Sequence, residues 1–379
     1  MQPTINGYCH DKFERVRDAF ANNFADGGDV GASFALTVDG EYVVDLWGGH
    51  LDVEQQRPWL EDTIVNVYST TKTMAALCAL VLADRGEIDL YAKVAKYWPE
   101  FAQNGKADVE VRHFMSHSAG LSGMDGPLTA ADLYDWEKMT SLLAAQAPWW
   151  KPGTQSGYHA ITQGYLIGEV VRRVTGSTLG TFFRREIAEP LGADFHIGLD
   201  PRHFGRVGDL IPPPAGNAPV TSELANSIAA RTFRYPAVNA LDSRTSAWRR
   251  AEIPAANGHG NARSVVKVQS LIANGGSAFG KRMLSKEGCD RVFDEQFNGL
   301  DLVLGVPIRF GMGYGLNSET LPLGPNPHTC FWGGWGGSLV IVDTDAHVCL
   351  SYVMNKMGEG TTGDIRGGRL AAATFQSLA

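Results

Sequence analysis

The sequence is short of the residues that build a disulfide framework or a membrane protein. Its 379 residues include only five cysteines, an odd and widely spaced set, which argues against structural disulfides and against a zinc site. Residues 1–6 contain neither a basic start nor an apolar run, so they are not typical of a secretory signal. We therefore expect a protein of the reducing cytoplasm that has no membrane partner.

The chain also lacks a basic stripe. Its formal net charge is −8, and its 33 lysines and arginines are scattered singly or in pairs. Nucleic-acid binding normally needs clustered basic residues that neutralise phosphates, so we expect no nucleic-acid partner. The composition is otherwise that of an ordinary globular enzyme, and the length allows one to three domains.

Several familiar catalytic signatures are absent as well. No G-x-S-x-G string occurs, which weakens an α/β-hydrolase interpretation. No H-E-x-x-H or C-x-x-C string is available for a metal ion. The sequence therefore predicts chemistry that needs neither a metal nor an organic cofactor.

The start of the chain predicts a helix followed by a hairpin. Residues 11–23 place apolar side chains at intervals of three or four, which is typical of an amphipathic helix. Two β-rich runs, 32–38 and 41–46, follow it. Asp39-Gly40 joins them, and such a pair is a strong signal for a tight hairpin turn.

The next segments predict a sharp change from strand to helix and then a helical insert. A strand-like run over 64–68 meets Ser69, and an apolar helical pattern over 73–85 ends near Gly86. Between residues 90 and 254, helical patterns alternate with long connections that contain glycine and proline. The clearest later elements are helices at 131–144, 164–174, 262–273 and 369–378 and strands at 338–342 and 347–354.

These elements predict an α/β fold of the α+β type. An antiparallel sheet built from both chain ends would be flanked by the terminal helices, with a mainly helical domain inserted. The α/β domain would comprise residues 1–92 and 255–379, and the helical domain residues 93–254. A cleft between the two domains would be the natural place for a ligand.

Ser69 and Lys72 form an S-x-x-K string where the predicted strand gives way to the helix. On a helical turn the i, i+3 spacing places both side chains on one face, so the amine can reach the hydroxyl. A serine becomes a good nucleophile when a neighbour removes its proton, and a lysine can do so when burial lowers its pKa. Backbone N–H groups at a helix start also favour the oxyanion of acyl transfer.

The string alone is weak support, because the segment from Ser264 to Lys267 matches the same pattern. There we favour an ordinary amphipathic helix that follows a glycine-rich turn. Ser69 differs from Ser264 by its position between a strand and a helix.

Four strings strengthen the interpretation of the Ser69 site. In their order and spacing they resemble class C β-lactamases and the related family VIII carboxylesterases, and the resemblance spans about residues 31–354. It implies a β-lactamase or penicillin-binding-protein fold and a serine hydrolase. The four strings are Ser69 to Lys72, Ser116 to Leu121, Pro152-Gly153 with Tyr158-His159, and Trp332-Gly333-Gly334.

The second motif of that family is a tyrosine with an asparagine two residues later, and here it reads Tyr158-His159-Ala160. The resemblance implies that Tyr158 passes protons to the leaving group, and a nearby lysine ammonium would make its phenol a better acid. Ala160 departs from the lactamase pattern, which puts recognition of an amide side chain in doubt.

The third motif of lactamases, Lys-Thr/Ser-Gly, is replaced by Trp332-Gly333-Gly334, as in family VIII esterases. The tryptophan removes the cation that would hold a β-lactam carboxylate, so we expect Trp332, Gly333 and Gly334 to contact uncharged esters. By position, the backbone N–H groups of Ser69 and Trp335 would form the oxyanion hole.

Three further residues lie beside these motifs. We expect His117 to be a buried, hydrogen-bonded residue that holds its loop together rather than a base. We expect His159, which is next to Tyr158, to line the cleft. Trp149 would either cap an acyl pocket or be an exposed aromatic residue at a domain hinge.

The sequence thus predicts a carboxylesterase that hydrolyses short-chain esters through an acyl-enzyme on Ser69, with weak β-lactam hydrolysis. Lys72 and Tyr158 would be its acid and base groups. A β-lactamase, a D-amino-acid peptidase or an acyltransferase would use the same site. A penicillin-recognising protein that binds without turnover is a second alternative. The sequence indicates neither the natural substrate nor the oligomeric state.

Overall fold

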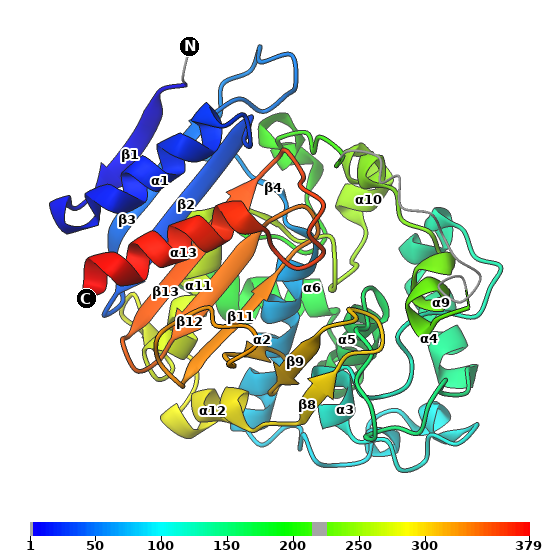
Figure 1. Cartoon of the computed structure of the whole chain (residues 1–379). Helices are drawn as coiled ribbons and strands as arrows, with labels where there is room; N and C mark the ends of the chain where they lie inside the picture. Colours follow the sequence, from blue (N-terminus) through cyan, green and yellow to red (C-terminus); the bar gives the residue numbers. More distant parts are fainter. Residues whose placement is uncertain (1–2, 214–225) are drawn as a thin grey trace.

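Both ends of the chain contribute strands to one sheet, so that segments far apart in sequence lie side by side (Figure 1). The computed structural model describes residues 3–213 and 226–379. Residues 214–225, which belong to the predicted helical insert, lie outside the described residues. The two-domain boundaries near residues 92 and 254 stay a prediction.

Within the described residues, nine strands form an antiparallel sheet in the order β1-β3-β2-β13-β12-β11-β10-β9-β8. This agrees with the expected antiparallel sheet built from both chain ends. The strands are β1 Ile5–Cys9, β2 Gly31–Val38, β3 Glu41–Gly49, β8 Phe297–Leu300, β9 Pro307–Phe310, β10 Gly315–Leu316, β11 Thr329–Gly333, β12 Leu339–Asp343 and β13 Val348–Met354.

The predicted hairpin is present, and its turn shows why Asp39-Gly40 is needed there. Asp39 and Gly40 have φ values of 51° and 79°, and the tight turn between right-handed twisted strands requires positive φ at both positions. The edge strand β1 was not predicted. Its alternating apolar pattern is weak because its three central residues are exposed.

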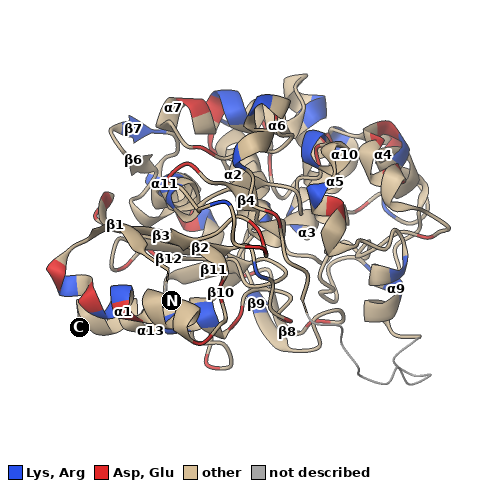
Figure 2. Ribbon diagram, turned by 90° about the horizontal axis from the view of Figure 1, so that it is seen from above, with Lys and Arg blue, Asp and Glu red and all other residues tan. Residues whose placement is uncertain are grey.

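Helices cover both faces of the sheet (Figure 2). On one face α1 Glu14–Ala25 and α13 Ile365–Leu378 pack against each other. On the other face α11 Ala262–Ala273 lies against β2 and β13, with bounds that match the predicted helix. Beside it, α2 Thr71–Asp84 is buried along almost its whole length, because its apolar residues occupy every side of the helix.

The region between α2 and α11 is mainly helical and lies beside the sheet (Figure 1). The predicted helix at 131–144 is split into a 3-10 turn, Ala130–Tyr134, and a helix, because the Asp135 side chain caps the N-terminus of the second element. The helices described here are α3 Val111–Met115, α4 Trp136–Ala145, α5 Thr162–Thr175, α6 Leu179–Phe183, α7 Glu189–Leu191, α9 Ile228–Arg234 and α10 Ser246–Arg250.

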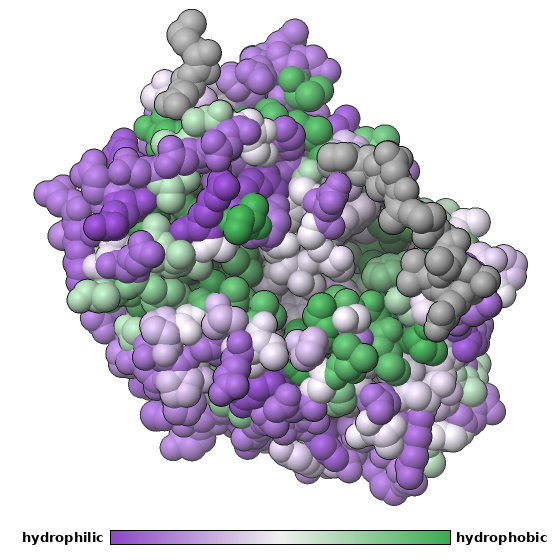
Figure 3. Space-filling model, in the orientation of Figure 1, coloured by the Kyte–Doolittle hydropathy of each residue, from purple (hydrophilic) through white to green (hydrophobic). Residues whose placement is uncertain are grey.

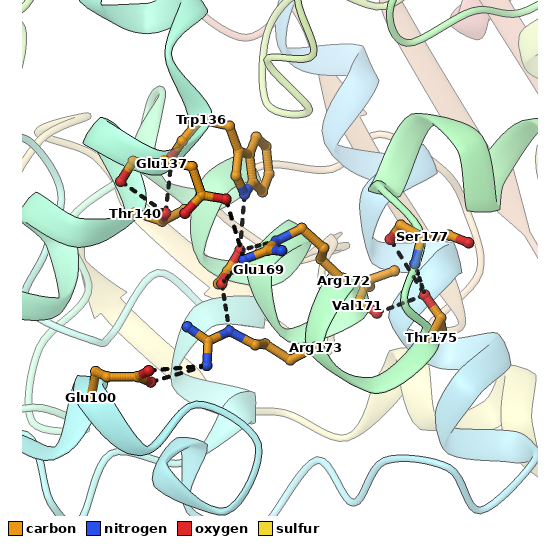
Figure 4. A network of polar contacts seen from close by, with 10 residues as sticks. All are labelled: Glu100, Trp136, Glu137, Thr140, Glu169, Val171, Arg172, Arg173, Thr175 and Ser177. Carbon is orange, nitrogen blue, oxygen red and sulfur yellow. Dashed lines mark hydrogen bonds and ion pairs between the residues drawn. The ribbon is translucent and has the colours of Figure 1, made fainter.

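A buried carboxylate fixes α5 to its surroundings (Figure 4). Glu169 on α5 accepts hydrogen bonds from Arg172 and Arg173 and from the indole N–H of Trp136 on α4 at 2.8 Å. Its side chain is only 1% exposed, and a buried charge is tolerated when it is paired and hydrogen-bonded in this way. The network holds in place the helix that begins directly after the Tyr158 segment.

Small elements complete the frame of the cleft. A two-stranded ladder joins β4 Val65–Asn66 to β5 His259–Gly260, so the segment before Ser69 is tied to the segment before α11. Among the described residues, no helix is long and apolar enough to cross a membrane. The remaining short elements are β6 Ser277–Ala278, β7 Lys281–Arg282 and α12 Lys286–Asp290.

Candidate active site

Ser69 lies in a tight turn between a strand and a buried helix. After β4, one 3-10 turn over Tyr68–Thr70 leads directly into α2. Tyr68 adopts a positive φ of 42°, a conformation that costs energy for a residue with a side chain and is common at functional sites. The turn leaves Ser69 on the wall of a cleft although it is largely buried.

Lys72 approaches Ser69 from one helical turn further on, as the spacing predicts. Its Nζ lies 3.1 Å from the Oγ of Ser69, 2.7 Å from the main-chain oxygen of Ala160 and 2.9 Å from that of Ala255. Burial lowers the pKa of Lys72 well below its usual value. A neutral amine fits this geometry, since its two N–H groups satisfy the two carbonyls and its lone pair faces the hydroxyl.

Tyr158 closes the arrangement from the helical region. Its hydroxyl donates to the Oγ of Ser69 at 2.5 Å, and the Nζ of Lys72 lies 4.8 Å from the centre of its ring. Burial raises the pKa of Tyr158 above its usual value, while the hydrogen bond to Ser69 acts in the opposite direction. The expectation that the nearby lysine makes this phenol a better acid is therefore wrong for the resting site, because removal from water dominates.

A buried aspartate that the sequence reasoning missed holds the Tyr158 segment. The carboxylate of Asp301 accepts the backbone N–H of Tyr158 at 3.0 Å and the hydroxyl of Ser156 at 2.7 Å. It also accepts the backbone N–H groups of Val303 and Leu304. Asp301 follows β8 and belongs to no catalytic motif, so only the folded structure shows its contact with the site.

The loop after β11 brings a second backbone donor close to Ser69. The N–H of Trp335 has no hydrogen-bond partner within residues 3–213 and 226–379, and its ring contacts that of Tyr68 at 5.1 Å. A Cβ atom on Gly334 would stand 2.2 Å from the main-chain oxygen of Val67, so only glycine allows this approach. The turn and the loop therefore meet at the cleft, which both Ser69 and Trp335 line.

The other residues of the third motif do not lie on the surface of the cleft. Trp332 is only 1% exposed and packs behind Tyr158 and His117, with ring centres 5.4 Å and 5.8 Å away. A Cβ atom on Gly333 would stand 2.4 Å from the main-chain oxygen of Thr362, so this glycine allows close packing of the protein backbone. Among the described residues of this region, Trp335 lines the cleft, whereas Trp332, Gly333 and Gly334 do not.

His159 does not line the cleft, contrary to expectation, and like His117 it lies buried behind the cleft wall. The ring of His159 bonds to the main-chain oxygen of Gly157 and accepts the N–H of Leu121, and its side chain is fully buried. Burial lowers the pKa of His159 to about 3, so it is neutral at physiological pH. His117 is buried and accepts the N–H of His159, which agrees with its expected loop-holding role.

Trp149 is also displaced from the expected position. Its ring is covered by the guanidinium of Arg231, which lies 4.0 Å from the ring centre, and it does not belong to the wall of the cleft. A cation–π contact with Arg231 therefore covers the ring, and Trp149 does not cap the cleft.

The cleft beside Ser69 has a volume of about 290 Å³ and is mostly apolar. A pale and green recess is visible near the middle of the face in Figure 3. None of the described residues that line the cleft is charged at neutral pH. Most of this wall carries no motif that sequence reasoning could recognise. Its residues come mainly from the segments 122–124, 160–162 and 232–238.

The site can therefore activate a serine hydroxyl and stabilise an oxyanion beside an apolar pocket. Within the described part of the chain, no group of three or more histidine, cysteine, aspartate or glutamate residues could hold a metal ion. The chemistry available comes from the hydroxyl of Ser69, the amine of Lys72, the phenol of Tyr158 and two backbone N–H groups.

Comparisons with known proteins match most of the chain. A family model described as Beta-lactamase matches residues 16–374. The Esterase/beta-lactamase LipL of Mycobacterium tuberculosis is 38% identical over 363 residues, which cover 93% of this chain and 83% of the relative.

Two solved structures match this chain over almost its whole length. The crystal structure of a family VIII carboxylesterase shares 45% identity with a TM-score of 0.93, and the match covers 99% of this chain and 100% of that one. A penicillin-binding-protein homologue from Caulobacter crescentus shares 41% identity with a TM-score of 0.91, and the match covers 99% and 100% of the two chains.

Proposed function

The chain belongs to the β-lactamase family, and from this we propose that it is a serine carboxylesterase that hydrolyses short-chain, uncharged esters through an acyl-enzyme on Ser69. One observation carries the assignment of the nucleophile. The Oγ of Ser69 lies within hydrogen-bonding distance of both the Lys72 amine and the Tyr158 hydroxyl, on the wall of an apolar cleft.

Acylation begins when the Oγ of Ser69 attacks the ester carbonyl carbon and its proton passes to the Nζ of Lys72. The carbonyl oxygen becomes an oxyanion, which the N–H groups of Ser69 and Trp335 stabilise; one such donor typically contributes about 3 kcal/mol. The bond to the alcohol oxygen then breaks. Tyr158, still protonated because it is buried, donates its proton to this oxygen and recovers one from Lys72.

Deacylation uses the same groups with water. A water molecule loses a proton to Lys72 and attacks the acyl carbon, and the acid leaves as Ser69 recovers its proton. The amine of Lys72 suits both steps, because burial keeps a large fraction of it neutral at a pH where an exposed lysine is almost fully charged.

The cleft favours the binding of uncharged esters over that of penicillins and cephalosporins, because the carboxylate of those compounds would need a cation to pair with. None of its described lining residues supplies one. Weak β-lactam hydrolysis remains compatible with the site because acylation uses the same groups. The five cysteines are all free thiols, which supports a location in the reducing cytoplasm.

The test is a panel of nitrophenyl esters, a chromogenic cephalosporin and D-alanyl amides, with and without an alcohol acceptor, for the protein and its Ser69→Ala variant. We expect the esters to be the best substrates and Ser69→Ala to fold normally but lose nearly all turnover. A preference for the cephalosporin, the amides or transfer to alcohol would identify one of the alternative activities.

A phosphonate ester followed by mass spectrometry tests the nucleophile directly. A covalent adduct on Ser69 is expected and would exclude a protein that only binds. Full activity of Ser69→Ala would show that the nucleophile is assigned wrongly.

A further inference from the structure

The two backbone donors of the oxyanion hole come from segments that are far apart in sequence. The turn Val67–Thr70 carries the N–H of Ser69, and the loop Gly334–Ser338 carries the N–H of Trp335. Their separation must be set to within a fraction of an ångström, because oxyanion donors act at about 2.7–3.1 Å. The contact that joins the two segments therefore matters for catalysis.

Besides the ring contact between Tyr68 and Trp335, the two segments are joined by the hydrogen bonds of one buried hydroxyl. The Oγ of Ser338 donates to the main-chain oxygen of Val67 at 2.8 Å and lies 2.9 Å from the Oγ1 of Thr70. Since Ser338 has only one hydroxyl proton, Thr70 must be the donor in the second bond. The result is a chain of two hydrogen bonds that holds the turn at Val67 and at Thr70, on either side of Ser69.

The remaining hydrogen bonds of the loop either lie within it or lead to the segment 358–366. The N–H of Gly336 donates to Gly360 at 2.9 Å, and Arg366 donates to the main-chain oxygen of Gly336 at 2.8 Å. These bonds tie the loop to the C-terminal part of the chain. In the part of the chain that the structure describes, no hydrogen bond other than those of Ser338 joins the loop to the turn.

We propose that Ser338 is a positioning residue that sets the separation of the two oxyanion donors, and this rests on the proposed function. Its side chain is buried and does not line the cleft, so it cannot bind substrate directly. Loss of the hydroxyl should leave the approach of substrate unchanged and weaken only the stabilisation of the oxyanion. A displacement of about 1 Å in a catalytic group can lower the rate by about 100-fold.

The chain offers a matched control for Ser338→Ala. Ser351 is also a fully buried serine in this part of the sheet, and its hydroxyl donates to the main-chain oxygen of Leu339 at 2.9 Å. We expect Ser338→Ala to lower kcat by about 10- to 100-fold with KM within twofold of the parent protein. Ser351→Ala should lose comparable thermal stability and keep its kcat.

A pair of substrates separates positioning from general destabilisation. The sulfur of a thionoester accepts hydrogen bonds poorly, so an intact oxyanion hole favours the matching oxygen ester. We expect Ser338→Ala to reduce the ratio of kcat/KM for the oxygen ester to that for the thionoester, while Ser351→Ala retains the parent ratio. An unchanged ratio in Ser338→Ala would overturn the proposal.

Thr70→Val provides a second route that preserves shape. It removes the other hydroxyl of the chain, and we expect a smaller fall in kcat together with a smaller change of the substrate ratio in the same direction. Combined with Ser338→Ala it should add little, because the two hydroxyls act through one chain. If Ser338→Ala fails to fold, Thr70→Val alone decides, and a parental ratio in it counts against the proposal.

The Ser69→Ala variant keeps the two proposals apart. If it retains full activity, the proposed function fails. If it is inactive while Ser338→Ala matches Ser351→Ala in kcat and in the substrate ratio, only the role of Ser338 fails.

Discussion

The Nζ of Lys72 donates to the main-chain oxygen of Ala160 at 2.7 Å, at the position where class C β-lactamases carry an asparagine. A backbone carbonyl thus orients the lysine where the alanine side chain cannot. Together with the main-chain oxygen of Ala255 it gives the amine two acceptors and leaves its lone pair for Ser69. The partners of Lys72 are neutral, so no nearby carboxylate raises its pKa.

The first prediction concerns the dependence of activity on pH. Lys72 must be neutral to accept the serine proton, and burial lowers its pKa well below the usual value. The kcat/KM for a neutral ester should therefore rise with pH on a single protonation step and level off above it. Lys72→Arg should lose about 1000-fold in kcat, because a guanidinium stays charged throughout. A flat profile between about pH 5 and pH 9 would contradict this role for Lys72.

The second prediction concerns stability and uses the same lysine. Between its lowered pKa in the folded protein and about 10.4 in the unfolded chain, only the unfolded state holds the proton. The free energy of unfolding should therefore rise with pH relative to Lys72→Met, by up to about 1.4 kcal/mol per pH unit. Denaturant titrations of both proteins across this window measure the slope. If the free energies of unfolding of the two proteins changed in parallel with pH, Lys72 would be protonated in the folded protein.

The third prediction concerns the apolar wall. Phe233 lines the cleft and is 50% exposed, so removal of its ring should hardly affect folding. Phe233→Ala should lower kcat/KM for a hexanoyl ester about fivefold by loss of about 1 kcal/mol of apolar contact, and leave an acetyl ester unchanged. Leu241→Ala is the control, because Leu241 is 46% exposed and lies outside the cleft wall. Equal effects of both variants would place the acyl chain elsewhere.

The fourth prediction concerns Asp301, whose carboxylate accepts four hydrogen bonds. Asp301→Ala leaves these donors buried without a partner and should destabilise the protein by about 3 kcal/mol or more. Asp301→Asn retains one acceptor oxygen and should be milder. Thermal unfolding measures the stability of both variants. A fall in kcat for Asp301→Asn at unchanged KM would show that the backbone of Tyr158 has moved. Parental stability in Asp301→Ala would show that water replaces the carboxylate.

The sequence correctly predicted the structural features that depend only on the spacing of neighbouring residues. The contact between Ser69 and Lys72 follows from one helical turn, and the hairpin at Asp39-Gly40 follows from the φ values of two neighbouring residues. The antiparallel sheet flanked by helices agrees with the fold that the family resemblance implied.

The sequence could not reveal contacts that have no side-chain signature. Ala255 and Ala160 act through carbonyl oxygens, which every residue possesses. Asp301 reaches the site only because β8 and β9 fold beside the helical region. Trp332 matched the motif position, yet its neighbours bury it behind Tyr158.

Strand β2 lies inside the sheet between β3 and β13, and this affects how the chain folds while it is being synthesised. One edge of β2 pairs with β3 soon after synthesis, but the other pairs with β13, and Thr37 and Cys349 lie 312 positions apart. Until β13 has been synthesised, that edge of β2 has no partner strand, and its backbone N–H and C=O groups are open to pairing with other chains. We therefore expect added chaperones and slow, cool expression to raise the yield of active protein.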